Sequence, residues 1–150
     1  MAHYHATIRS RHGAADTFDY LARFSNAAEW DPGVLAGEQL DPGPVRVGTR
    51  FRLQVSFLGR GLPLTYAVTR HVAPGEVALD AAGRLLLAAD RITVTPDGTG
   101  ATVSYDADVR LRGPLRLLDP VLRRGFRAVG DRAAAGLAAA LAGPVPGQDR

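Results

Sequence analysis

The 150-residue chain has no cysteine, no lysine and no apolar run that approaches a membrane span of ~20 residues. Without cysteine it cannot form disulfide bridges or thiolate metal sites, and such a composition is usual in a reducing compartment. The first residues, MAHYH, lack the basic start and apolar stretch of a signal peptide. We therefore expect a cytoplasmic protein with no stable membrane insertion.

The sequence also lacks the basic pattern that is typical of nucleic-acid-binding proteins. All 18 basic residues are arginines scattered along the chain, and only Arg123 and Arg124 are adjacent. Nucleic-acid-binding proteins usually gather basic residues on one face and interleave aromatic residues with them. The net charge of +3 therefore does not predict a nucleic-acid partner.

Motifs for nucleotide binding and nucleophilic catalysis are missing as well. The glycine clusters match neither G-x-x-x-x-G-K nor G-x-G-x-x-G, and there is no G-x-S-x-G. His3 and His5 share one face of the first predicted strand, but no third ligand lies nearby, and neither His12 nor His71 can be placed beside them. We expect neither a cofactor nor a metal ion.

The first part of the chain predicts one strand and two short helices. Residues Tyr4–Ser10 alternate as in a strand. Asp16 can then cap a helix whose apolar residues run from Phe18 to Phe24 at helical spacing. A second short helix follows and ends at Asp31-Pro32-Gly33.

From Val34 onward the pattern alternates with a period of two, which indicates strands joined by tight turns. Six strands are expected, within residues 34–40, 49–58, 64–72, 76–80, 84–95 and 101–111. A long helix then begins with Asp119 as N-cap and Pro120 in its first turn. Its apolar stripe runs from Leu122 to Leu141.

These elements predict a single α+β domain over residues 1–142, with a flexible tail over residues 143–150. The antiparallel sheet of six to seven strands has one apolar face to cover, and a single long helix is available to cover it. A curved sheet wrapped on one helix either leaves a cavity or forms an ordinary filled core. The pattern alone leaves both arrangements open.

The segment Phe18–Val34, with Trp30-Asp31-Pro32 near its end, resembles the opening of polyketide cyclase/dehydrase-type members of the START and birch-pollen-allergen-like (SRPBCC) superfamily. Val47–Phe51, Asp97–Val103 and Gly113–Leu115 fit the same pattern in order, so the resemblance covers nearly the whole chain. It implies a helix-grip fold with a deep pocket between the sheet and the C-terminal helix. It also implies binding of lipids, polyketides or other apolar metabolites.

The inward phases of the strands and the last helix supply candidate ligand-binding residues. They are Trp30, Phe51, Leu53, Val55, Phe57, Leu64, Tyr66, Val68, Arg70, Asp90, Ile92, Tyr105, Leu118, Leu122 and Phe126. His71 alternates away from Tyr66 and Val68, toward solvent. Trp30 either forms part of a lid or anchors the short helices on the sheet.

Asp90 is the most informative candidate, because its phase places a carboxyl among inward apolar residues. An unpaired buried carboxylate costs several kcal/mol, so it needs a partner or a proton. Arg70 shares the inward phase and is a candidate ion-pair partner. Alternatively, Asp90 acts as a general base or holds a ligand hydroxyl. Tyr66 and Tyr105 either orient a ligand or pack their rings and bond to backbone carbonyls.

The sequence therefore supports three functional hypotheses. The first is binding of an apolar small molecule that is lipid-, polyketide- or aromatic-like. The second is a polyketide-type cyclase or dehydratase, in which Asp90 or Tyr66 transfers a proton. The third, a protein-interaction domain, would need an exposed apolar patch on the outer sheet face, where the outward phases are charged.

Overall fold

The computed structural model describes residues 2–57 and 59–143. After β1 (Ala2–Ser10) come α1 (Ala14–Ala22), a 3-10 turn η1 (Phe24–Asn26) and the four-residue α2 (Ala27–Trp30). Six strands follow: β2 (Val34–Gln39), β3 (Arg50–Phe57), β4 (Arg60–Val72), β5 (Glu76–Ala82), β6 (Leu86–Asp97) and β7 (Gly100–Leu111). A second 3-10 turn, η2 (Gly113–Leu118), leads into the long helix α3 (Asp119–Ala142).

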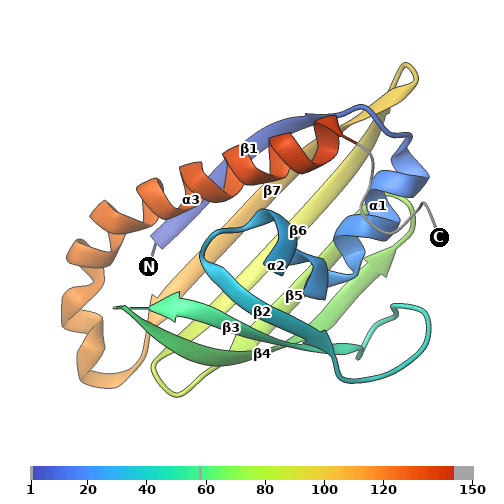
Figure 1. The fold of residues 1–150 in the computed structure, drawn as a ribbon. Helices are drawn as coiled ribbons and strands as arrows, with labels where there is room; N and C mark the ends of the chain where they lie inside the picture. Colours follow the sequence, from blue (N-terminus) through green and yellow to red (C-terminus); the bar gives the residue numbers. More distant parts are fainter. Residues whose placement is uncertain (1, 58, 144–150) are drawn as a thin grey trace.

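The seven strands form one antiparallel sheet in the order β1-β7-β6-β5-β4-β3-β2. Strands β2 to β7 follow one another as a meander, and β1 closes the other edge by pairing with β7 from Ala2↔Val109 to Ser10↔Ala101. The sheet curls as a half-barrel, and α1, α2 and α3 lie on its concave side (Figure 1). This is the helix-grip fold that the sequence predicts.

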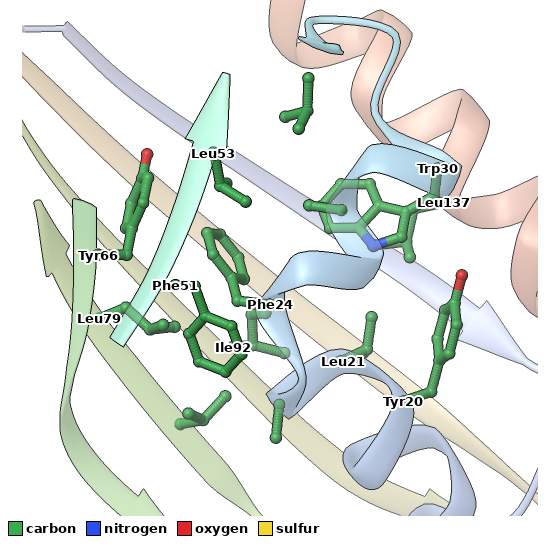
Figure 2. Packing of buried hydrophobic residues seen from close by; sticks show 14 of the residues in the cluster. Tyr20, Leu21, Phe24, Trp30, Phe51, Leu53, Tyr66, Leu79, Ile92 and Leu137 are labelled. Atoms are coloured by element: carbon green, nitrogen blue, oxygen red, sulfur yellow. The ribbon is translucent and has the colours of Figure 1, made fainter. Parts of the chain in front are cut away.

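One end of the concave side is filled by a compact apolar core. Phe51 of β3, Leu79 of β5 and Ile92 of β6 lie together there (Figure 2). Phe18 of α1 belongs to the same core, and all four side chains are essentially without solvent exposure. Burying each such side chain contributes about 1.5–3 kcal/mol to folding. Helix α1 and the turn η1 therefore fill this end of the half-barrel.

The long helix α3 covers the sheet unevenly. Its buried residues are Gly130, at the middle of the helix, and Leu137 and Leu141 in its C-terminal half. That half lies beside β1, whereas η2 and the first turns of α3 extend past the sheet (Figure 1). The predicted apolar stripe from Leu122 to Leu141 thus packs closely only toward its end, and the space under its first half stays open.

A β-bulge in β4 corrects two predictions. Val68 pairs with Leu79 and Arg70 with Ala78, so Thr69 is an extra residue that reverses the facing of the residues after it in the strand. Arg70 is therefore exposed, and its guanidinium lies 3.2 Å from Glu76, not beside Asp90. His71 turns inward, where its ring meets that of Phe18 at a centroid distance of 5.3 Å.

The starts of two predicted helices also differ from the structure. Helix α1 begins at Ala14, before the predicted cap Asp16, and α3 includes Asp119 as its first residue after Leu118 as N-cap. The 3-10 turn η2 leads directly from β7 into α3, so the chain is already helical before Asp119. The predicted flexible tail lies, apart from Gly143, outside the described residues.

Candidate functional site

A cavity of about 560 Å³ lies between the concave face of the sheet, α2 and the first half of α3. Its wall is predominantly apolar and comes from β1, β3, β4, β6, β7, η2 and α3. The volume lies within the range of about 300–1,000 Å³ that is usual for small-molecule sites. The C-terminal half of α3 closes it on one side, where Leu137 is fully buried.

Most of the predicted site residues lie in the wall of this cavity. They are Trp30, Leu53, Val55, Phe57, Leu64, Tyr66, Asp90, Tyr105, Leu118, Leu122 and Phe126. Phe51, Val68 and Ile92 are buried but belong to the filled core under α1 and η1, so they do not line the cavity. Arg70 is excluded from it by the bulge in β4.

Asp90 projects from β6 into this apolar environment and is only 7% exposed. The hydroxyl of Tyr105 on the neighbouring strand β7 donates a hydrogen bond to its Oδ2. Burial raises the pKa of the Asp90 carboxyl to about 7, and the hydrogen bond from Tyr105 opposes this rise only in part. At neutral pH the group therefore exists both as acid and as carboxylate.

No arginine or histidine among the described residues forms an ion pair with Asp90. The predicted partner, Arg70, is engaged with Glu76, which also accepts a hydrogen bond from Arg91 at 3.0 Å. A carboxyl committed to a salt bridge would be locked as an anion, whereas Asp90 remains free to gain or lose a proton. This arrangement decides against the structural ion pair that the sequence left open.

Tyr66 of β4 contributes a second polar group to the cavity. Its ring packs against Phe24 of η1 at a centroid distance of 4.9 Å, and Figure 2 shows its hydroxyl pointing away from Leu79. Burial raises the pKa of this phenol well above its ordinary value, and the nearby carboxylates of Asp90 and Asp31 add to the rise. Tyr66 is therefore a neutral hydroxyl that can donate a hydrogen bond.

Trp30 both anchors α2 and lines the cavity. Its ring meets Tyr105 edge to face at a centroid distance of 5.7 Å, and its backbone lies against Gly136 of α3. Asp31 follows at the cavity wall and accepts a hydrogen bond from the backbone N–H of Gly33 at 2.8 Å. Burial raises the pKa of Asp31 as well, so two protonatable carboxyls face one apolar space.

Sequence reasoning missed the contribution of β1 and of the exposed turns of α3. Tyr4, Ala6 and Ile8 line the cavity from β1, as do Val121 and Arg132 from α3. The alternation of residues 4–8 carried the signal for β1, but the pairing of this strand with β7 was needed to place it. The hydroxyl of Tyr4 is turned away to donate to Asp131 at 2.8 Å.

The described residues contain no group of three or more histidine or acidic side chains placed to hold a metal ion. His3 and His5 instead contact Asp108 and Asp106, at 2.6 and 2.8 Å, between β1 and β7. None of the described helices combines the length and the apolarity needed to cross a membrane.

Comparison with known proteins identifies the family of this chain. Residues 1–142 match the family model described as polyketide cyclase / dehydrase and lipid transport. The chain belongs to this family. No curated protein matches the sequence.

Solved structures share the fold at low sequence identity. A START superfamily protein from Mycobacterium smegmatis superposes with a TM-score of 0.77 at 16% identity, covering 94% of this chain and 97% of that one. The Zhui aromatase/cyclase from Streptomyces sp. R1128 gives a TM-score of 0.73 at 17% identity, covering 99% and 95%. At these identities the likeness establishes the family's helix-grip fold and leaves the ligand open.

Proposed function

We propose that this protein binds an apolar small molecule, lipid-, polyketide- or aromatic-like, inside the half-barrel. The observation that carries the proposal is the apolar cavity of about 560 Å³ with a few polar groups converging in it. Transfer of apolar surface from water would drive binding at about 25 cal/mol per Å². Asp90, Tyr66 and Tyr105 would orient the bound molecule by hydrogen bonds.

Filling the cavity tests this proposal. Ala133 lines the cavity from α3, so Ala133→Phe puts a ring where a ligand would lie. We expect the neutral probe N-phenyl-1-naphthylamine to bind the unmodified protein and to bind Ala133→Phe at least about tenfold more weakly, a loss of about 1.4 kcal/mol. Fluorescence titration measures both affinities.

Ala138→Phe is the matched control, because Ala138 lies on the exposed face of the same helix and outside the cavity wall. Its affinity for the probe should equal that of the unmodified protein. Failure of the unmodified protein to bind the probe, or equal binding by both variants, would contradict the proposal. Native mass spectrometry of the purified protein would reveal an apolar molecule that co-purifies with it.

A second candidate function is a polyketide-type cyclase or dehydratase. The observation that favours it is a carboxyl with a pKa of about 7, hydrogen-bonded to a phenol and free of any ion pair among the described residues. Such a group can accept and return a proton at neutral pH, while the cavity holds a flexible chain in a reactive conformation. Turnover of a poly-β-carbonyl compound distinguishes this function from binding alone.

A further inference from the structure

The polar groups beside Asp90 in the cavity are carboxyls and phenols. Asp90 and Asp31 are the acidic residues of its wall, Tyr66 and Tyr105 contribute phenols, and the single basic residue among the described wall residues, Arg132, is exposed on α3. An anionic group buried beside Asp90 would meet another carboxylate and no cation. A cationic group there would find a carboxylate and the faces of aromatic rings.

We propose that the cavity selects its guest by the charge of the guest's polar end, and that it accepts an apolar molecule ending in a protonated amine while rejecting the matching carboxylate. This inference rests on the proposed binding function. Tyr105 satisfies Oδ2 of Asp90 and leaves the second carboxylate oxygen to accept from the guest. The rings of Trp30 and Tyr105, 5.7 Å apart, add cation–π attraction.

The electrostatic surroundings of Asp90 support the same selection. The groups that act electrostatically on Asp90 are Tyr105 and Asp108 of β7, Asp80 of β5 and Asp31 after α2. The phenol of Tyr66 on β4 is also close enough to interact with the Asp90 carboxylate. None of these groups carries a positive charge. A bound ammonium ion would therefore supply the positive charge that the protein itself does not, and Asp90 would lose its proton when the amine binds.

Competition between matched guests tests the charge selection. We use 1-naphthylmethylamine, 1-naphthylmethanol and 1-naphthoate, each displacing N-phenyl-1-naphthylamine at pH 8. We expect the amine to bind at least about tenfold more tightly than the carboxylate, with the alcohol between them. The preference should shrink at pH 6, where Asp90, with a pKa of about 7, is mostly protonated.

Asp90→Asn should lower the affinity for the amine to that for the alcohol. Asp80→Asn is the matched control, because it removes an exposed carboxylate from the adjacent strand. A carboxylate that binds as tightly as the amine, or an amine preference that survives in Asp90→Asn, would overturn the inference. If the unmodified protein did not bind the neutral probe at all, the proposed function would be refuted instead. The two failures are therefore distinguishable.

An independent observation concerns the tip formed by η2 and the first turns of α3, residues 112–127. Leu117 is 85% exposed and Val121 is 68% exposed, although both are large apolar residues. Residues 112–127 hold five arginines and one aspartate, so the tip carries a charge of +4 in a chain whose net charge is +3. Leu118 and Val121 also line the cavity, which places the tip beside its opening.

We infer that this tip docks on an anionic lipid surface. Exposed apolar side chains among arginines match the apolar interior and negative headgroups of such a surface, and arginine side chains can reach the phosphates from a shallow position. A guest leaving the cavity would then enter the lipid without crossing water.

Vesicle sedimentation tests the docking. At low salt we expect the protein to bind phosphatidylcholine vesicles that contain phosphatidylglycerol, and to bind pure phosphatidylcholine vesicles at least about fivefold more weakly. High salt should release the protein, because it shortens the Debye length and screens the attraction. Leu117→Asp with Val121→Asp should abolish binding. Val47→Asp is the control, because Val47 is 62% exposed in a loop far along the chain from the tip. The inference would be overturned if the protein did not bind the vesicles, even if it were retained on an immobilised acidic protein. It would also be overturned if Val47→Asp lost vesicle binding to the same extent as the double variant.

Discussion

Replacing Gly136 by alanine is expected to destabilise the protein by about 1–3 kcal/mol or more, even though alanine is the better helix former. A Cβ atom at Gly136 would overlap the carbonyl oxygen of Trp30 and lie 3.1 Å from its carbonyl carbon. Both are backbone atoms and cannot rotate away, so α3 would have to move off α2. Chemical denaturation measures the loss as a lower midpoint at unchanged slope.

Gly125→Ala is the matched control in the same helix, because no atom lies within 4 Å of the position of its Cβ. It should stabilise the protein by up to about 1 kcal/mol through helix propensity alone. Opposite signs for the two substitutions would show that Gly136 is required for close packing. Equal stabilisation by both would contradict the contact between α2 and α3.

Asp90→Asn is expected to make the protein more stable at pH 8 and to flatten its pH dependence between about pH 4 and 7. The pKa of Asp90 is about 7 in the folded state, against an ordinary value of 3.8. The folded state therefore binds a proton more tightly than the unfolded state, so stability falls as pH rises through this window. The full penalty above pH 7 is on the order of 4 kcal/mol.

The comparison of variants at two pH values isolates this effect, because other groups titrate equally in both proteins. We expect the stability of Asp90→Asn relative to the unmodified protein to be clearly greater at pH 8 than at pH 5, measured by urea denaturation. A constant difference across the range would mean that Asp90 keeps an ordinary pKa. A large loss of stability at both pH values would mean that the carboxyl is a structural partner after all.

Stability and binding thus make opposite demands on Asp90. A carboxyl that weakens the folded state at neutral pH and pairs with no base among the described residues is poorly explained by structure alone. It is explained if the group meets a ligand in the cavity. The hydrogen bond from Tyr105 holds it in place while leaving it able to change its protonation.

Much of the fold could be predicted from the sequence, because its signals are local. The alternation in residues 101–111 and 49–58 predicts β7 and β3, and both strands are found within a residue or two of the expected ends. Two residues of β4 were assigned to the wrong face for one reason. Thr69 adds a bulge to the strand, and a single extra residue reverses the facing of Arg70 and His71 without leaving any mark in the pattern.

The cavity depends on distances that no local pattern contains. Phe51 and Leu53 share one face of β3, yet Phe51 packs in the filled core and Leu53 lines the cavity. The difference arises because α1 and η1 plug one end of the half-barrel, whereas the first half of α3 stands off the other. Gly130 and Gly136 fix that position by letting Tyr4 and the backbone of Trp30 approach the helix closely.

The sequence by itself determined the elements, their order and the inward phase of Asp90, Tyr66 and Tyr105, because each depends on hydrogen bonding and burial along a short stretch of chain. Only the tertiary structure decided that Asp90 has a phenol in place of the predicted arginine as its partner, and that the space around it is open. The hydrogen-bond partner of a side chain and the empty space around it depend on how separate elements pack together. That packing involves the whole sheet, so no short stretch of sequence specifies it.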